Sequence, residues 1–466
     1  MTQVATPETV LAPLERRGDE TWAPEGRVVM TTGSHHEQAY WVRGASGELR
    51  LSSLVWIREE RRLIPRADAF LRPPETAMPN ARWSSNCIQC HATGGRPKLS
   101  GDRFDTEAVE LGIACEACHG PGGEHVEKHR DPIERWIARG DGKADPTIVN
   151  PAKLDPERAA AVCGQCHSYA YPKDENDWWT NGYAAAFRPG QLLDSSRILL
   201  TLDVLHASAA SMSRSGPSIE AQDDSIYWAD GTIRVAGREY NALVLSPCFE
   251  KGSGARKMTC TSCHAMHAGD PDDQIAPDKS GDAMCTGCHA TERAPEHTHH
   301  ARGSIGSRCI ECHMPMTSYA LFTAIRSHRI ESPSIGERLS ACNLCHLDRT
   351  LAWTDTKLGE WYGTPRARLS GDALTVPAAA VWGLRGNAAE RALAAAAMGR
   401  KEALDASGRD WERPVLDALR ADPYAAVRFI AERSLRSVSS GGSLISQEIV
   451  RMEIARRDDR PVTIAE

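Results

Sequence analysis

The chain has 466 residues, 41% of them hydrophobic, and a formal net charge of −7 from 55 Lys and Arg against 62 Asp and Glu. The negative charge argues against nucleic acid as a partner, and the absence of any run of about 18 apolar residues argues against a transmembrane segment. Length alone predicts two to four domains.

Residues 1–85 lack cysteine and are expected to form an N-terminal region of strands and loops. Strand-like stretches occur at residues 27–31 and 49–51, and a proline-rich stretch follows at 72–74. Residues 1–20 are polar and contain no apolar segment typical of a secretion signal.

Residues 86–350 contain seven copies of the pattern Cys-x-x-Cys-His, which use 14 of the 15 cysteines. Two thiols at this spacing add to the two vinyl groups of one haem, and the adjacent histidine becomes the proximal ligand of its iron. The cysteines are Cys87, Cys90, Cys115, Cys118, Cys163, Cys166, Cys260, Cys263, Cys285, Cys288, Cys309, Cys312, Cys342 and Cys345. The motif histidines are His91, His119, His167, His264, His289, His313 and His346.

A single copy of this pattern would also suit half of a zinc site or a redox dithiol. A zinc site does not need a histidine directly after every second cysteine, so seven copies favour haem. We therefore predict seven covalently bound c-type haems, with thioethers rather than disulfides at the paired cysteines. Because c-type haem is attached outside the cytoplasm, we expect a periplasmic or extracellular protein whose leader is not part of this numbering.

The motifs fall into two groups separated by a long gap between His167 and Cys260. In the second group they begin only 25, 24 and 33 residues apart, which leaves one short helix or loop for each haem. We therefore expect the haems to lie close together. Within the gap, Asp230-Gly231 between two strand-like stretches predicts a β-hairpin over residues 226–235.

Residues 365–438 are rich in Ala, Leu and Arg, contain neither Cys nor His, and are predicted to form amphipathic helices. The clearest unit, 414–435, reads as two packed helices with a break at Asp422-Pro423, and residues 376–398 suggest another. This pattern is HEAT-like, and two units need a neighbour to cover their apolar faces. They are expected to cap the haem region or to form a docking surface for a partner. Residues 439–466 are expected to be a partly ordered tail.

The sixth ligand of each iron decides between electron carriage and catalysis, because a second histidine closes the site and an open position admits a substrate. Ten of the 17 histidines lie outside the motifs, enough for seven sixth positions. The distal candidates are His35, His36, His125, His129, His267, His297, His299, His300 and His328, with His206 the weakest; for each, the alternative is a surface or propionate-binding histidine.

Three local features favour particular candidates. His35 and His36 are adjacent, and on an extended segment they would point to opposite sides and serve two haems. His125 follows glycines that permit the chain to return toward a neighbouring haem. His267 comes three residues after His264 and would suit a neighbouring haem rather than its own.

The fifteenth cysteine, Cys248, has no partner in the motif pattern. It is expected to be a buried thiol packed against haem, a distal thiolate ligand, or a thiol that faces a substrate. Arg238, Glu239 and Tyr240 precede it and suggest either a polar pocket or a propionate-binding network. Arg238, Tyr240 and Cys248 are therefore the only candidates for catalysis.

Four segments together resemble a known family: residues 32–36, 115–122, 237–249 and 260–267. They resemble bacterial multihaem c-type cytochromes of the cytochrome c-552/c-554 type, some of which carry HEAT-like tails. The resemblance covers most of residues 30–350, and in related folds the histidine at the position of His125 is a distal ligand. The wider group includes hydroxylamine oxidoreductase-like and nitrite-reducing enzymes, but no motif here has lysine in place of the proximal histidine.

We predict a mainly α fold with extensive loops, in which a multihaem cytochrome c core carries small β-hairpins and a C-terminal α-helical HEAT-like segment. The favoured function is electron transfer to redox partner proteins through haems that are mostly or all held by two histidines, with docking through the C-terminal helices or self-assembly into longer wires. The alternative is an oxidoreductase that acts on a small nitrogen or sulfur oxyanion at one open or Cys-influenced haem.

Overall fold

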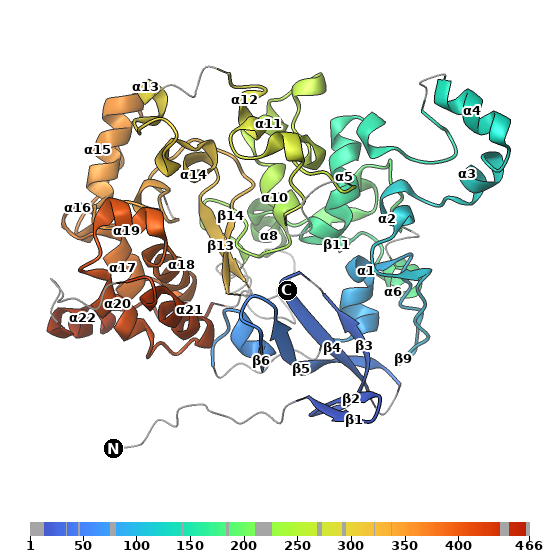
Figure 1. Cartoon of the computed structure of the whole chain (residues 1–466), viewed down its shortest axis with the longest axis horizontal. Coiled ribbons are helices and arrows are strands. Elements are labelled where there is room, and N and C mark those ends of the chain that lie inside the picture. The colour runs from blue at the N-terminus through green and yellow to red at the C-terminus, as the bar shows by residue number, and fades with distance from the viewer. Residues whose placement is uncertain are drawn as a thin grey trace.

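The computed structural model describes residues 14–33, 35–44, 47–74, 81–140, 144–182, 186–209, 226–267, 273–290, 295–320, 322–336, 338–438 and 447–462. Its N-terminal region is a six-stranded sheet in which each strand pairs antiparallel with the next (Figure 1). The strands are β1 (Glu15–Arg17), β2 (Glu20–Ala23), β3 (Gly26–Thr32), β4 (Glu37–Arg43), β5 (Leu49–Ile57) and β6 (Arg62–Pro65).

Both strands expected from the sequence are present, within β3 and β5, but the sheet is larger than expected. Trp41 on β4 and Val55 on β5 are fully buried, and Trp41 packs edge-on against Trp83 at the start of the motif region. The sheet is therefore stabilised by contacts with residues distant in sequence.

The motif region is built from short helices and two-stranded ribbons joined by loops. Its helices are η1 (Arg66–Ala69), η2 (Trp83–Cys87), α1 (Ile88–His91), α2 (Cys115–His119), α3 (Gly123–Lys128), α4 (Pro132–Gly140), η3 (Pro151–Lys153), α5 (Pro156–His167), α6 (Glu175–Asn181), η4 (Leu193–Ser195), α8 (Leu202–Ala209), α10 (Glu239–Leu243), α11 (Pro247–Glu250), η5 (Gly254–Arg256), η6 (Cys260–Ser262), η7 (Pro277–Lys279), α12 (Ala283–Thr286), α13 (Pro295–Thr298), η8 (Ile305–Ser307), α14 (Cys309–His313), η9 (Cys342–Leu344), α15 (Leu351–Tyr362) and α16 (Asp372–Thr375). The ribbons pair β7 (Ala92–Thr93) with β10 (Glu110–Leu111), β8 (Leu99–Ser100) with β9 (Arg103–Phe104), β11 (Ala170–Pro172) with β12 (Arg197–Leu199), and β13 (Met316–Ala320) with β14 (Thr323–Arg326).

Residues 226–235 form the predicted turn, but only one pair, Tyr227 and Ile233, makes a β-bridge. The turn itself is closed by the Trp228 N–H, which donates to Thr232 O at 2.8 Å. The flanking side chains are used for packing instead of for a longer sheet, because the Trp228 indole donates to Thr317 O at 2.9 Å and Arg234 donates to Asn387 at 3.1 Å.

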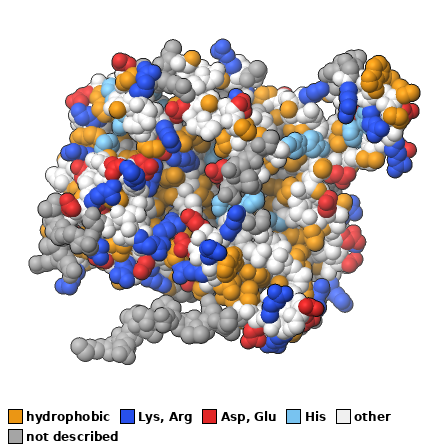
Figure 2. Space-filling model, viewed as in Figure 1, with side chains coloured by type: hydrophobic (Ala, Val, Ile, Leu, Met, Phe, Trp, Pro, Cys, Tyr) orange, Lys and Arg blue, Asp and Glu red, His pale blue; other side chains and the backbone are white. Residues whose placement is uncertain are grey.

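Helices α3 and α4 form an arm that extends away from the rest of the molecule (Figure 1). Ile133, Trp136 and Ile137 on α4 are exposed, and apolar side chains gather at the tip of this arm (Figure 2). Within the described residues, no helix combines the length and the hydropathy that crossing a membrane requires.

The C-terminal region is a group of packed helices, as the sequence predicts. They are α17 (Ala378–Arg385), α18 (Ala388–Met398), α19 (Lys401–Ser407), α20 (Glu412–Leu419), α21 (Ala425–Leu435) and α22 (Gln447–Ile454). Helix α18 packs against α17, α20 and α21, and the predicted break at Asp422-Pro423 lies between α20 and α21. The assignment of these helices to the HEAT type stays a prediction. Of the expected tail, residues 439–446 and 463–466 lie outside the described residues.

The C-terminal helices pack on the motif region. The Phe429 ring on α21 lies 3.9 Å from that of Phe322, beside the β13–β14 ribbon, and Arg433 donates to Phe322 O. Arg400 donates to Glu311, the residue before Cys312, at 2.8 Å. One apolar core therefore continues from the N-terminal sheet to these helices.

Candidate haem-binding sites

Each Cys-x-x-Cys-His motif includes or adjoins one short helical turn. The turns belong to α1, α2, α5, η6, α12, α14 and η9. In such a turn, residues three and four positions apart lie on one face, so both thiols and the histidine point to the same side. Helix α5 is the longest of these because Asp155 caps it, accepting the Arg158 N–H at 3.0 Å, and Pro156 starts its first turn.

Four motif histidines face a second histidine ring from elsewhere in the chain. The pairs and their centroid distances are His119 with His267 at 6.0 Å, His264 with His328 at 6.3 Å, His313 with His297 at 6.2 Å, and His346 with His300 at 6.0 Å. The planes in the first and third pairs are within 8° of parallel. Two imidazoles that bind one metal from opposite sides, each nitrogen about 2 Å away, have centroids roughly 6 Å apart. The pairs thus fit the axial ligands of haem iron.

The hydrogen bonds of these rings agree with that role. Nδ1 of His119 donates to Val149 O at 2.7 Å, Nδ1 of His264 to Asp273 O at 2.9 Å, and Nδ1 of His313 to Glu331 O at 2.9 Å. Two of the facing rings do the same, since Nδ1 of His300 lies 2.6 Å from Thr298 O and Nδ1 of His328 lies 3.2 Å from Arg326 O. A carbonyl can only accept, so Nδ1 carries the proton and Nε2 is left to bind a metal.

The three remaining motif histidines are His91, His167 and His289, and none of them faces a histidine ring in this way in the part of the chain that the structure describes. Nδ1 of His167 donates to Glu239 Oε2 at 2.9 Å. Burial is the largest influence on the pKa of this carboxyl and raises it, but the hydrogen bond with His167 and the electrostatic interactions with His167 and His328 together outweigh burial and lower the pKa to about 2.

The other distal candidates lie in different surroundings. His35 and His36 are exposed in the β3–β4 turn, where Arg58 bonds their carbonyls, and His206 is exposed on α8. The His299 ring stacks on Trp361 at 4.1 Å and does not face a motif histidine. Of the group His297, His299 and His300, the structure therefore brings the first and third, but not the second, to a motif.

His125 and His129 lie together on the arm, with ring centroids 4.5 Å apart. Both contact Asp145, and one ligand atom from each of the three residues lies within 4.8 Å of the others, so the group could hold a metal ion. Hydrogen bonds from Thr147 and His129 lower the pKa of Asp145. The sequence signal for this group is the His-x-x-x-His spacing, which places both rings on one helix face. The sequence alone does not show that Asp145 belongs to the group, because only the fold brings it to the two histidines.

Thiols of different motifs approach one another, so the motifs form one continuous series. The neighbouring thiols are Cys90 with Cys166, Cys118 with Cys163, Cys163 with Cys260, Cys263 with Cys285, Cys285 with Cys309, and Cys312 with Cys342. The third motif, with Cys163 and Cys166, is hydrogen-bonded with thiols of the first and fourth motifs and interacts electrostatically with the second. A cavity of about 410 Å³ beside His119 is lined by residues 144–150, among others.

The three catalytic candidates are engaged in structural contacts. Arg238 donates to Cys166 O at 3.0 Å, and the buried Tyr240 packs in a core with Ala160 and Phe187. Burial raises the pKa of Tyr240 to about 12. Cys248 is half-buried on α11, where burial and the nearby Cys288 raise the pKa of its thiol. The sequence did not single out Glu239 as a partner of a motif histidine.

Comparisons with known proteins agree with the motifs. Residues 253–294 match the family described as doubled CXXCH motif, residues 69–120 match cytochrome c554 and c-prime, and residues 292–357 match cytochrome c552. Over 228 residues the chain is 21% identical to the multiheme cytochrome MtrA of Shewanella baltica (strain OS185), a match that covers 47% of this chain and 56% of that protein. The crystal structure of the outer cell wall cytochrome OcwA aligns over 87% of each chain with 15% identity and a TM-score of 0.44.

Proposed function

Since the chain is a bacterial multihaem c-type cytochrome, we propose that it carries electrons through seven covalently bound haems, mostly or all held between two histidines. The observation that carries the proposal is the set of four facing histidine pairs. A second histidine fills the sixth position of an iron, which closes the site to substrate and favours electron carriage. The thiol contacts between motifs support one connected path.

In this function the bound haems supply a series of one-electron couples, and the chain supplies attachment, ligands and spacing. The motif cysteines fix each haem, and the carbonyls of Val149, Asp273 and Glu331 hold the motif rings in one tautomer. For the irons at His91, His167 and His289, the remaining candidate ligands are His35, His36, His125, His129 and His206.

We also propose that the protein works outside the cytoplasm, because c-type haem is attached there. It would exchange electrons with redox partner proteins. The C-terminal helices already cap the motif region through Phe429 and Arg400, so a partner would bind their outer surface. Self-assembly would extend the same path between copies. Sedimentation of the purified protein across a concentration series tests self-assembly.

Spin state and carbon monoxide binding test the proposed function. The oxidised holoprotein should give low-spin EPR signals for all haems, and the reduced protein should bind no carbon monoxide. One high-spin haem that binds carbon monoxide would contradict a fully closed electron carrier.

The same experiment addresses a second candidate, an oxidoreductase for a small nitrogen or sulfur oxyanion. It is favoured by one observation, that three motif histidines face no second histidine among the described residues. A single carbon monoxide site in the reduced wild-type protein, together with reoxidation of the reduced haems by a nitrogen or sulfur oxyanion, would support this candidate.

A further inference from the structure

The motif histidine His167 has a hydrogen-bond partner unlike those of three other motif histidines. His119, His264 and His313 donate from Nδ1 to main-chain carbonyls, whereas His167 donates to the Glu239 carboxylate at 2.9 Å. A bond to an ionised acceptor is stronger than a bond to a neutral one. It draws the Nδ1 proton toward the acceptor and makes the imidazole a more basic ligand.

Local packing fixes Glu239 in this position. Its second oxygen, Oε1, accepts the Gly237 N–H at 2.9 Å, so both oxygens are oriented. Glu239 starts α10, which packs against α5, the helix that carries the third motif. A Cβ atom at Gly164 would lie 2.8 Å from the Tyr240 ring, so glycine inside the motif permits this close approach of the two helices.

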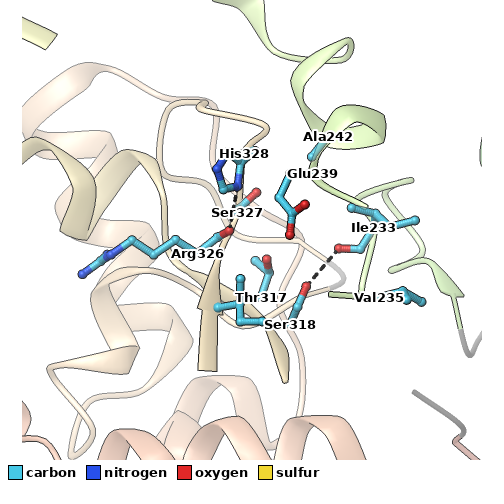
Figure 3. Close-up of a pocket in the computed structure, with 10 residues that line it drawn as sticks. Ile233, Val235, Glu239, Ala242, Thr317, Ser318, Arg326, Ser327 and His328 are labelled. Carbon is cyan, nitrogen blue, oxygen red and sulfur yellow. Dashed lines mark hydrogen bonds between the residues drawn. The ribbon is translucent and has the colours of Figure 1, made fainter. Parts of the chain in front are cut away.

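The same carboxylate lies beside a ligand candidate of the next motif. Glu239 and His328 line one small cavity, of about 10 Å³, and come from different segments of the chain (Figure 3). His328 faces His264 at 6.3 Å, and its ring interacts electrostatically with Glu239. The nearest cation in sequence, Arg238, donates to Cys166 O and Gly237 O.

The third motif is also the junction of the series. Its Cys166 thiol is hydrogen-bonded with Cys90 of the first motif, and its Cys163 thiol with Cys260 of the fourth. Cys118 of the second motif interacts with Cys163 electrostatically. One connection between the first three motifs and the last four therefore runs through the third motif, beside the one that the His119–His267 pair makes.

We propose that Glu239 is a positioning residue that lowers the reduction potential of the haem attached at Cys163 and Cys166, and so makes this haem an uphill step for an electron that enters it. The proposal rests on the proposed electron-transfer function. Each passage moves one electron from a ferrous to a ferric iron, with no bond made or broken. A more basic axial imidazole stabilises the ferric state, and this lowers the potential.

The test is the variant Glu239→Gln in the holoprotein, studied by spectroelectrochemical titration. Glutamine keeps the size and an acceptor oxygen but removes the charge. We expect the midpoint potential of one of the seven one-electron components to rise by about 59 mV. This shift corresponds to about a tenfold change in the equilibrium constant for reduction of that haem. The matched control is Glu116→Gln, because Glu116 lies in the second motif and accepts the Gly122 N–H at 2.7 Å without contact to a ligand ring; its titration should overlay that of the wild type.

An unchanged titration of a fully loaded Glu239→Gln protein would overturn the inference, as would an equal shift in the control. If the variant does not load haem, EPR of the wild-type protein at stepped potentials decides: the low-spin signal with the strongest ligand field must disappear last on reduction, and its early loss would refute the proposal. Haem content and carbon monoxide binding of the wild type test the proposed function separately, since they do not depend on Glu239.

Discussion

Neighbouring histidines take different positions in the segment 297–300. His297 faces His313, and His300 faces His346, but His299 between them stacks on Trp361. His299 has a φ of +54°, and this left-handed residue turns its side chain away from its neighbours. The two outer residues are therefore the ligand candidates of the segment.

A pair of substitutions separates these positions. In His300→Asn, the haem at His346 should lose its sixth ligand, become high-spin and bind about one equivalent of carbon monoxide after reduction. In His299→Asn, which keeps a residue that tolerates left-handed backbone, all haems should stay low-spin. Carbon monoxide difference spectra measure both, and binding in the second variant but not in the first would contradict the assignment.

The site could be predicted from the sequence only in part, for a physical reason. The motif cysteines and histidines are fixed by covalent chemistry within five residues, so their pattern is visible directly. The facing pairs join residues as distant as His119 and His267, and their order depends on loops. The same holds for Glu239 and His167, which are 72 residues apart.

At the scale of elements, the contact between α5 and α10 positions the third motif. Gly164 lies under the Tyr240 ring, whereas Gly287, which also lies inside a motif, has nothing within 4 Å of an added Cβ.

Gly164→Ala should therefore destabilise the holoprotein by about 1–3 kcal/mol, since the new methyl group forces α10 away from α5. Gly287→Ala is the matched control and should leave the urea midpoint unchanged. Chemical unfolding followed by far-UV circular dichroism measures both variants. Equal midpoints for the two would show that the close packing at Gly164 is not required.

The C-terminal helices are held by a buried ion pair. Arg391 on α18 donates to both oxygens of Asp422, at 2.7 and 3.1 Å, and both side chains are almost completely buried. Asp422 also accepts the Tyr424 N–H at the start of α21. The pair thus joins α18 to the break between α20 and α21.

Asp422→Asn should cost about 3–5 kcal/mol, because it leaves the Arg391 charge buried without its counter-charge. Asp405→Asn is the control, since Asp405 pairs with Lys401 and Arg409 at the surface, where screening makes such pairs weak. Thermal unfolding of the two holoproteins should show a large decrease in the midpoint temperature for Asp422→Asn and almost none for Asp405→Asn. A small loss at Asp422 would mean that the C-terminal helices do not depend on this pair.

At the scale of the whole molecule, the sequence was most informative where periodicity or covalent spacing is local. The C-terminal helices and the strands at 27–31 and 49–51 follow from local patterns and are present. The full six-stranded sheet was not foreseen, because Trp41 is buried by a contact with Trp83, 42 positions later in the chain, and Val55 by strands that pair with its own on both sides. The arm of α3 and α4 was not foreseen either, since it depends on where the chain leaves the packed core.

For the whole molecule, we propose that the seven motifs hold seven connected redox centres. Coulometric reduction of the purified holoprotein tests this most directly, because each haem takes up one electron. We expect each chain to take up seven electrons on reduction and to release all of them on reoxidation. An uptake of six or fewer would contradict it, because at least one motif would then hold no haem that exchanges electrons with the others.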